Sequence, residues 1–464
     1  MLRDGAAYLA SLKGRQIYEA GRLLENPAED SGTARTAQFI AGLLNECRSA
    51  DSEVSENGVL LAYKLASSSD DVRARGRAFA AIARRSGGLM GRSPDFLATI
   101  LTAWRGAADS FGEYADNVVR YWENAGQANL VLTHAISDPP ADRHLPADAK
   151  GPLRTLRAVR ETDEGIVVRG AKMLATLAPF ADDLLVYPFR PLAETEADQA
   201  LCFAVPVSTP GLTLYCRPSL ARRDVGDHPL SAVFDEMDAI CVFDDVLIPW
   251  ERVFINQDLT RANNLRAATG MTAYAWHQSA VRAWIKAELV FELANSCAKV
   301  SGKAGSDPVR QQLGELAGIA ESMRALVVSA EAGARQDEHG HFIADPVPLA
   351  TSGMLNATLY PRAIELLQLV VGSGLIMHPL TADEAEGSPA HDYFQHYFAG
   401  VGADGVRHGR LLRAAADLAL DAFGGRQMLY ERLFLGPPDA FRAKFYDQYQ
   451  AGRGTGGMLS CLLP

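Results

Sequence analysis

The sequence predicts an α+β fold with an N-terminal helical domain, a middle antiparallel β-domain and a C-terminal four-helix bundle. Two observations support this prediction. The spacing of apolar residues changes from three or four positions to two and then back again, and a linker rich in Pro and Asp marks the first change. The expected domains are residues 1–137, 138–262 and 263–464.

The N-terminal third is predicted to be helical. From Gly5 to about Leu132, apolar residues recur every three or four positions, as in AGLLNECRSA and ATILTAWRGAADSFGEYADNVVRYWENA. This spacing places apolar side chains on one face of a helix. The linker SDPPADRHLPADAKGP follows, and its composition favours turns over a continued helix.

The middle of the chain is predicted to be antiparallel sheet or barrel. Short runs such as ALCFAVPVSTPGLTLYCRPS and DAICVFDDVLIPWERVF alternate apolar and polar residues and end at turn residues, which is typical of strands. Beyond about Asn263 the helical spacing returns in four long runs. A four-helix bundle is the simplest packing for four such amphipathic segments.

Composition excludes several classes of protein. Lys and Arg number 45 against 56 Asp and Glu, which gives a net charge of −11, and no basic run stands out, so nucleic acid is not an expected partner. No run reaches the ~18 apolar residues of a membrane span, and the N-terminus lacks the apolar core of a signal peptide. We therefore expect a cytoplasmic protein. Its six cysteines occur singly, which favours reduced thiols.

Arg92 lies at a predicted helix start in GLMGRSPDFLATIL. Gly91 and Pro94 interrupt any preceding helix, and Ser93 or Asp95 can cap the next one. The helix dipole disfavours a cation at this end. Two interpretations remain open from the local pattern: a surface charge, or an arginine that binds an anionic oxygen.

Two histidines are candidates for acid–base chemistry. His134 ends the apolar run in NLVLTHA, and His277 lies in AYAWHQSAVRAW on the first helix of the predicted bundle. For each, a structural role and a catalytic role remain open. No histidine pair has the spacing of a zinc site or a nearby cysteine, so no metal site is expected. The motifs of serine hydrolases, P-loop NTPases and Rossmann domains are absent from the sequence.

Closely spaced glycines occur in two helical regions, VVGSGLIMHP (Val370 to Pro379) and DAFGGRQMLYER (Asp421 to Arg432). Glycine costs a helix up to ~1 kcal/mol relative to alanine, so close approach of a bulky neighbour is a plausible compensation. That neighbour is either another helix or a cofactor, and the sequence leaves both open.

Several strings, in the same order from about residue 7 to residue 436, resemble one family. They are AYLASLKGRQIYEAG, GRSPDF, LTHAISDPPADR, GAKMLATLAPFAD, HPLSAVFDEMDAICVFDDVLIPWERVF, GSGLIM and FGGRQMLYERLFLG. Together they resemble the oxygenase component of two-component FAD-dependent aromatic hydroxylases, the 4-hydroxyphenylacetate 3-hydroxylase and chlorophenol monooxygenase family. The order of helices, β-domain and bundle is likewise similar to that of acyl-CoA dehydrogenases.

This resemblance implies an acyl-CoA dehydrogenase-like fold, usually a homotetramer. It implies reduced FAD as cofactor, supplied by a separate NAD(P)H:flavin reductase. The reduced flavin of such enzymes reacts with O2 to form a C4a-hydroperoxide, which hydroxylates a small phenolic or related aromatic substrate. The protein supplies position, charge and exclusion of water.

The resemblance also assigns site residues. Arg92 matches the family arginine that meets the phenolic oxygen, His134 matches a histidine of the same pocket, and His277 lies where the chlorophenol enzymes place a proposed base. Thr176, in LATLAP, would face the flavin N5–C4a edge, with Pro179 preventing further strand pairing. The other cofactor assignments are Asp142, Arg143, Arg426, Gly372 and Gly374.

One position departs from the 4-hydroxyphenylacetate enzymes. They often have Tyr four residues after the arginine, where this chain has Phe96. We therefore expect a less polar substrate pocket and leave the substrate open.

Three other functions fit the sequence less well. An acyl-CoA dehydrogenase-like enzyme that abstracts an α-proton needs a bundle glutamate as base, and no single glutamate stands out. A ligand-binding scaffold without catalysis would not need Arg92, His134 and His277 together. The related iron–sulfur enzyme 4-hydroxybutyryl-CoA dehydratase needs cysteines near Arg92, and this chain has none between Cys47 and Cys202.

Overall fold

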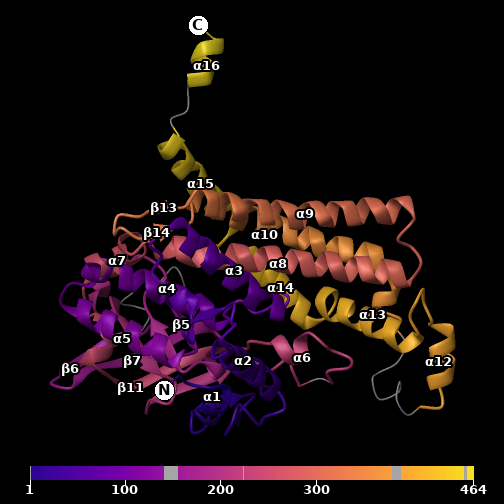
Figure 1. The fold of residues 1–464 in the computed structure, drawn as a ribbon. Coiled ribbons are helices and arrows are strands. Elements are labelled where there is room, and N and C mark those ends of the chain that lie inside the picture. Colours follow the sequence, from indigo (N-terminus) through magenta and orange to yellow (C-terminus); the bar gives the residue numbers. More distant parts are fainter. Residues whose placement is uncertain (1, 141–154, 223, 379–387, 454–456, 464) are drawn as a thin grey trace. The chain divides into compact units, whose positions relative to one another are not determined.

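The computed structural model describes the chain except for residues 1, 141–154, 223, 379–387, 454–456 and 464 (Figure 1). The chain forms two compact units, Met1–Ile285 with Glu331–Ala344, and Lys286–Ala330 with Asp345–Pro464. The N-terminal helices and the sheets therefore share unit 1. Helix α8 (Met271–Val300) begins in unit 1 and continues into unit 2. The three-domain division stays a prediction.

The first five helices of unit 1 confirm that most of the N-terminal third is helical, and two more helices of this unit follow later in the chain. They are α1 (Gly5–Ala10), α2 (Ala34–Cys47), α3 (Ser69–Arg85), α4 (Pro94–Gly106), α5 (Ala115–Ala128), α6 (Ser231–Phe234) and α7 (Leu259–Ala268). Helix α3 begins at an N-cap, Ser68, whose side chain accepts a hydrogen bond from the Asp71 N–H. Such a cap satisfies one of the N–H groups that a helix start leaves unpaired.

Unit 1 also holds two larger sheets. The first has the order β2-β1-β10-β11-β7-β6 and the second β12-β9-β8-β5. Their strands are β1 (Ile17–Glu19), β2 (Arg22–Leu23), β5 (Leu132–Ala135), β6 (Arg157–Thr162), β7 (Gly165–Thr176), β8 (Asp183–Val186), β9 (Cys202–Pro206), β10 (Leu212–Cys216), β11 (Asp238–Pro249) and β12 (Val253–Ile255). Two small hairpins pair β3 (Ser55–Glu56) with β4 (Val59–Leu60) and β13 (Arg335–Gln336) with β14 (Phe342–Ile343).

Most of the pairing is antiparallel, as predicted, but β1 pairs with β10 and β5 pairs with β8 in parallel. The prediction that the region from Gly5 to about Leu132 is helical is wrong for β1, β2, β3 and β4. A strand of three residues is too short to show a period, and β1 is stabilised by a strand almost 200 residues later in the chain.

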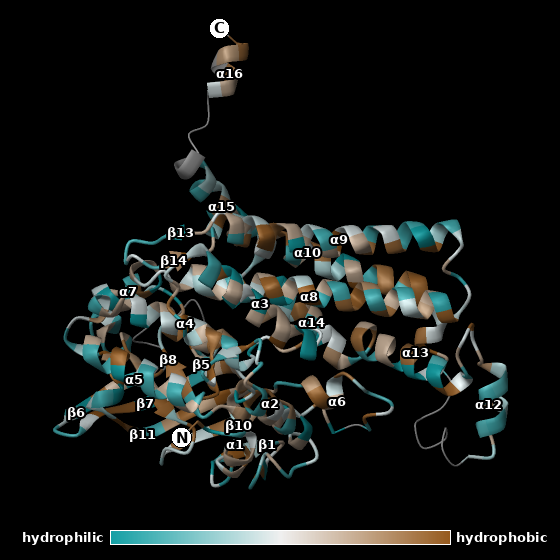
Figure 2. Cartoon of the chain, in the orientation of Figure 1, coloured by the Kyte–Doolittle hydropathy of each residue, from teal (hydrophilic) through white to brown (hydrophobic). Residues whose placement is uncertain are grey.

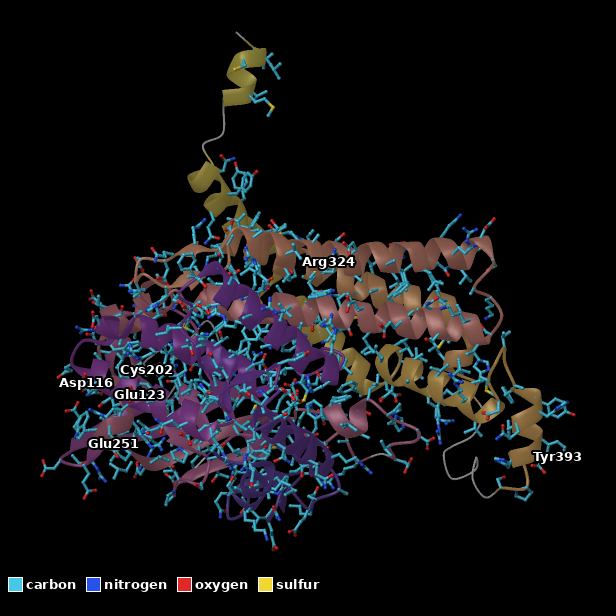
Figure 3. All side chains as sticks on the ribbon, viewed as in Figure 1. Asp116, Glu123, Cys202, Glu251, Arg324 and Tyr393 are labelled. Carbon is cyan, nitrogen blue, oxygen red and sulfur yellow. The ribbon has the colours of Figure 1, made fainter. Side chains whose placement is uncertain are left out.

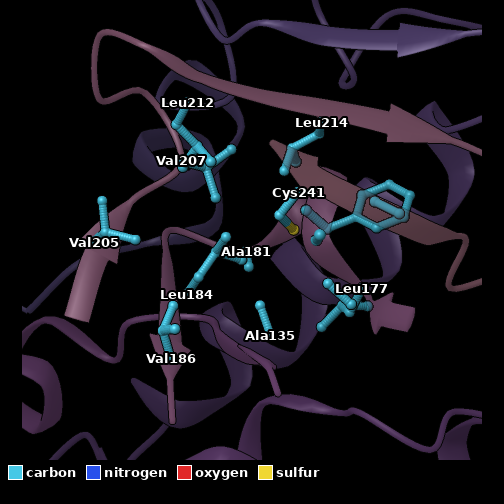
Figure 4. Packing of buried hydrophobic residues seen from close by; sticks show 14 of the residues in the cluster. Ala135, Leu177, Ala181, Leu184, Val186, Val205, Val207, Leu212, Leu214 and Cys241 are labelled. Carbon is cyan, nitrogen blue, oxygen red and sulfur yellow. The ribbon is translucent and has the colours of Figure 1, made fainter. Parts of the chain in front are cut away.

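The core of unit 1 fills the space between the two larger sheets. Leu184 of β8 and Val205 of β9 face Leu214 of β10 and Cys241 of β11, and all four are at most 1% exposed (Figure 4). Burial of each aliphatic side chain contributes roughly 1.5–3 kcal/mol. All six cysteines are free thiols, as expected.

Unit 2 is helical. Besides the end of α8, its helices are α9 (Asp307–Ala332), α10 (Pro346–Val371), α12 (His391–Tyr397), α13 (Gly405–Ala419), α14 (Ala422–Leu433), α15 (Pro438–Arg453) and α16 (Gly457–Leu462). Polar and apolar residues are interspersed along α8 and α9 (Figure 2). Within the part of the chain that the structure describes, no helix is both long and apolar enough to cross a membrane.

Candidate functional site

Arg92 lies just before α4, whose N-cap is Ser93 and whose first residue is Pro94. Pro94 favours this boundary because its fixed φ suits the first turn, where the missing N–H is not needed. Arg92 is only 8% exposed. Its backbone N–H donates to Glu236 Oε1 at 2.5 Å, and its guanidinium carbon lies 4.3 Å from the centroid of the Phe96 ring. Arg92 is therefore a buried cation rather than a surface charge.

His134 is bound to this arginine. Arg92 Nε donates to His134 Nε2 at 3.3 Å, and His134 Nδ1 lies 2.8 Å from the Tyr187 hydroxyl oxygen. Arginine has no acceptor, so Nε2 carries the lone pair and the neutral imidazole has its proton on Nδ1. Burial holds the pKa of His134 well below 6.5, and the positive charges of Arg92 and Arg266 add to this effect. His134 is thus neutral with a defined tautomer.

Thr176 ends strand β7 and is 6% exposed. Its hydroxyl donates to Asp238 Oδ1 at 2.6 Å, and the same two residues pair across the β7–β11 ladder. The next residue, Leu177, has a φ of 74°. This left-handed conformation is unusual for a residue with a Cβ atom, and it turns the chain out of the strand. Thr176 therefore lies at a fixed strand end with its hydroxyl already oriented.

Two connections join Thr176 to the arginine and the histidine. Glu236 accepts the Arg92 N–H on its carboxylate and the Leu177 N–H, at 3.1 Å, on its backbone carbonyl. Thr133, the residue before the histidine, donates its hydroxyl to the Thr176 carbonyl. Three of the predicted site positions and the Phe96 ring therefore gather in one region of unit 1.

His277, in the unit 1 part of α8, is 1% exposed. Its Nε2 lies 3.0 Å from Glu331 Oε1, and the Phe79 ring meets it edge-on at 5.4 Å. A carboxylate accepts, so Nε2 carries the proton and Nδ1 the lone pair. Nδ1 has no hydrogen-bond partner among the described residues. Burial lowers the pKa of His277, Glu331 raises it in part, and Arg75 lowers it further.

The contacts of His277 in the described part of the chain do not reach Arg92 or His134 directly, but the next residue of α8 connects it to the arginine segment. Gln278 Nε2 donates to Asp95 Oδ2 at 3.1 Å and approaches Ser93 Oγ at 3.4 Å. Burial raises the pKa of Asp95. Asp95 Oδ1 and Gln278 Oε1 both lack a partner within the described residues. Two buried acceptor oxygens next to the Arg92 segment therefore have no hydrogen-bond partner within the described residues.

Sequence reasoning missed Tyr187, Glu236 and Glu331 as members of this region. Tyr187 had a usable signal, because a tyrosine at the end of the buried run DLLVY needs a partner for its hydroxyl. The two glutamates had no such signal in the sequence. Nothing near Glu331, for example, points to a histidine 54 residues earlier.

The predicted cofactor residues of unit 2 have identifiable structural roles. Gly372 has a φ of 67° at the end of α10, a conformation that favours glycine. A Cβ atom on Gly374 would lie 3.0 Å from Leu412 Cδ2, so this glycine packs against α13. Arg426 is half-buried on α14. Their role toward a cofactor stays a prediction. Asp142 and Arg143 lie outside the described residues.

Comparisons with known proteins cover almost the whole chain. Residues 4–255 match the family model described as 4-hydroxyphenylacetate 3-hydroxylase N terminal, and residues 262–456 match its C-terminal counterpart. The chain is 34% identical over 461 residues to the 4-hydroxyphenylacetate 3-monooxygenase oxygenase component of Thermus thermophilus, which covers 97% of this chain and 95% of the relative. It is 31% identical to the 4-nitrophenol 2-monooxygenase oxygenase component of a Rhodococcus species, with 96% and 88% covered.

Solved structures agree. The crystal structure of a 4-hydroxyphenylacetate 3-monooxygenase oxygenase component complexed with FAD and 4-hydroxyphenylacetate matches with a TM-score of 0.91 at 33% identity, covering 96% of this chain and 95% of that one. An archaeal 4-hydroxybutyryl-CoA dehydratase from N. maritimus matches with a TM-score of 0.86 at 20% identity, covering 97% and 93%. At that identity the second likeness shows the fold alone.

Proposed function

The chain belongs to the 4-hydroxyphenylacetate 3-hydroxylase family, and we propose that the Arg92–His134 pair beside Thr176 is the place where it hydroxylates its substrate. The chain is the oxygenase component of a two-component, FAD-dependent aromatic monooxygenase. The acyl-CoA dehydrogenase-like α+β fold expected from the resemblance is confirmed. The observation that carries the site assignment is the buried guanidinium of Arg92, held by His134 and close to the end of β7.

We propose a para-substituted phenol as the substrate and the carbon next to the phenolic carbon as the site of hydroxylation. The compounds after which the two relatives are named, 4-hydroxyphenylacetate and 4-nitrophenol, both fit this description. A phenolate is a stronger carbon nucleophile than a phenol, and a buried cation favours the phenolate form. Arg92 supplies this cation. Phe96 supplies apolar surface beneath it, which suits the substrate ring.

Of the two histidines, His277 is the better candidate for the base that receives the phenolic proton. The His134 Nε2 lone pair is occupied by Arg92, whereas the His277 Nδ1 lone pair has no partner among the described residues. Glu331 stabilises the imidazolium that forms when His277 accepts a proton. Because burial lowers the pKa of His277, the imidazole is neutral and ready to act at neutral pH.

The residues at Thr176 fit a reduced flavin. The Thr176 hydroxyl uses its proton on Asp238, so its oxygen keeps acceptor capacity toward an N–H group such as the one at flavin N5. Bound reduced FAD supplies the electrons that activate O2, so that one oxygen atom enters the ring and the other leaves as water. Gly372, Gly374 and Arg426 are the unit 2 residues proposed to hold the cofactor. A separate NAD(P)H:flavin reductase is the proposed source of reduced FAD.

The alternative, abstraction of an α-proton, needs a buried glutamate of unit 2 as its base, and the described residues of this unit offer one. Glu431 is the buried glutamate of this unit, and both of its oxygens are occupied. Lys286 Nζ donates to one at 2.5 Å and Asn356 Nδ2 donates to the other at 2.7 Å. An ion-paired carboxylate is a weak base because the cation stabilises its charged form. We therefore favour hydroxylation.

We also propose that the protein is cytoplasmic and forms a homotetramer through unit 2. Apolar side chains on α14 and just before it are unusually exposed, with Leu420 at 50%, Leu429 at 58% and Leu433 at 45%. On α12 the exposed ring of Tyr393 (Figure 3) stacks on the exposed ring of Tyr397. Exposed apolar groups of this kind are typical of surfaces between subunits. Analytical ultracentrifugation of the wild type tests this, and a monomer at micromolar concentration would contradict it.

The hydroxylation itself is tested with photoreduced FAD, ¹⁸O2 and a panel of para-substituted phenols, with products identified by mass spectrometry. We expect a catechol that carries one ¹⁸O atom. Arg92→Ala should keep its affinity for reduced FAD and lose product formation. If no phenol of the panel gains oxygen while reduced FAD binds, the proposed function is wrong.

A further inference from the structure

We propose that Tyr187 is a positioning residue for the phenolate-binding arginine, acting through the hydrogen bond that its oxygen accepts from His134 Nδ1–H. The inference rests on the proposed function for the role of Arg92. The hydrogen-bond chain itself, from Tyr187 through His134 to Arg92, is a property of the free protein.

Tyr187 directly follows β8 and is 2% exposed. The indole of Trp104 meets its ring edge-on at 5.4 Å, and the guanidinium carbon of Arg266 lies 6.0 Å from its centroid. Arg266 is in turn fixed by a hydrogen bond to the Phe189 carbonyl at 2.8 Å. The hydroxyl is therefore held in place by packing on the rest of the ring.

The direction of each hydrogen bond in the chain follows from the residue types. Arg92 Nε can only donate, so His134 Nε2 must accept. A neutral imidazole then carries its proton on Nδ1, which donates to the Tyr187 oxygen. If the Tyr187 hydroxyl is removed, the Nδ1–H group stays buried without this acceptor. The ring gains nothing by changing tautomer, because an Nε2–H group would face the Arg92 Nε–H.

The charges around the hydrogen-bond chain from Tyr187 to Arg92 favour the binding of an anion at Arg92. Arg92 and Arg266 are cations, and His134 and Tyr187 between them are neutral, since burial lowers the pKa of His134 and raises that of Tyr187. Glu236 is a carboxylate in contact with this arginine, and it accepts the hydrogen bond of the Arg92 backbone N–H. A protonated His134 would lose its acceptor function and repel Arg92. Tyr187 thus holds the ring of the neutral histidine, protonated on Nδ1, and this ring in turn accepts from the guanidinium.

A purely structural tyrosine would affect folding alone, so the test measures phenolate binding. The probe is 4-nitrophenol, whose phenolate absorbs visible light. We expect Tyr187→Phe to bind the nitrophenolate about tenfold more weakly. The variant loses the hydrogen bond that holds His134, and His134 in turn holds the charged guanidinium of Arg92. The ionisation of bound 4-nitrophenol should also shift to higher pH. The matched control is Tyr121→Phe, a buried tyrosine of unit 1 whose hydroxyl donates to Asp183 at 2.8 Å. It should bind the probe like the wild type.

Wild-type affinity and unchanged ionisation in Tyr187→Phe would overturn the inference. A second measurement needs no variant: ¹⁵N NMR of the His134 imidazole in the free protein should show a neutral ring protonated at Nδ1 at pH 6, and an Nε2–H tautomer would also overturn it. If the NMR result is as expected but the wild type neither binds 4-nitrophenol nor hydroxylates any phenol, the proposed function fails instead.

Discussion

Gly76 on α3 leaves room for the carboxylate of Glu331: a Cβ atom at this position would lie 1.9 Å from Glu331 Oε1 and 3.1 Å from His277 Nε2. The close approach of Glu331 to His277 therefore depends on glycine in the facing helix. Because the clashing atom is the end of a flexible side chain, a larger residue would displace the carboxylate and leave the helix intact.

The first prediction concerns this glycine. Gly76→Ala should fold at least as stably as the wild type, since alanine favours a helix by about 1 kcal/mol. Phenol hydroxylation at pH 7 should fall about tenfold as Glu331 moves away from His277. Steady-state turnover and thermal unfolding check both points. Gly42→Ala is the control, because a Cβ on Gly42 of α2 would meet nothing within 4 Å; it should keep full activity.

The second prediction concerns the pH dependence of catalysis. A base acts in its deprotonated form, so the acidic limb of kcat/KM should follow the pKa of His277, which burial places below 6.5. Glu331 raises this pKa, so Glu331→Gln should move the limb to lower pH and reduce the plateau. Glu331→Asp retains a carboxylate, so it should shift the acidic limb less than Glu331→Gln does. A limb that stays in place in Glu331→Gln would rule out His277 as the base.

The third prediction concerns stability in acid. The pKa values of both His134 and His277 are lower in the folded protein than the unfolded value of about 6.5. Below that pH the unfolded chain binds protons that the folded chain does not, so stability is fully present above 6.5 and falls as the pH decreases. Each histidine contributes up to about 1.4 kcal/mol per pH unit.

Urea denaturation at pH 7, 6 and 5 measures this loss. Replacing His277 with Gln removes one titrating group and should flatten the curve. An unchanged slope would show that His277 is not buried in its neutral form.

The fourth prediction concerns the ion pair in unit 2. Lys286 and Glu431 are each about 1% exposed at their side chains. Lys286→Met leaves a buried carboxylate without its cation and should cost about 3–5 kcal/mol of unfolding free energy, and adding Glu431→Gln should recover much of it. The control is Arg324→Met, from an exposed pair with Glu321 on α9 (Figure 3). That change should cost less than about 1 kcal/mol, and an equal cost for both would contradict the prediction.

The fifth prediction concerns the strand end at Thr176. Thr176→Ala removes the hydroxyl between Asp238 and the proposed flavin. We expect more of the consumed O2 to appear as hydrogen peroxide and less as hydroxylated product, with a small change in melting temperature. Thr176→Ser, which retains the hydroxyl, should stay close to the wild type. A peroxide assay and oxygen uptake give the share of consumed O2 that appears as peroxide. An equal share in Thr176→Ala and the wild type would exclude Thr176 from the site.

How far the sequence alone reaches depends on the range of each interaction. Helical and strand periods are local, so the helices, the sheets and the boundary at Pro94 could be predicted. Arg92 and His134, 42 residues apart, could be paired only through a family resemblance, and the structure brings them within 3.3 Å. Glu331 was out of reach, because its role depends on which side chain the fold places opposite it, and for Tyr187 the sequence showed only that a buried hydroxyl needs a partner.

Strand β5 is four residues long, yet its successive residues serve the two halves of the proposed site: Thr133 holds the backbone of Thr176, and His134 holds Arg92. In the proposed site, one covalent step of about 3.3 Å along a strand therefore separates the residue on the cofactor side from the residue on the substrate side. A substitution that shifted β5 in its pairing with β8 would misplace Thr133 and His134 together, so a single short segment sets the register of both halves of the proposed site.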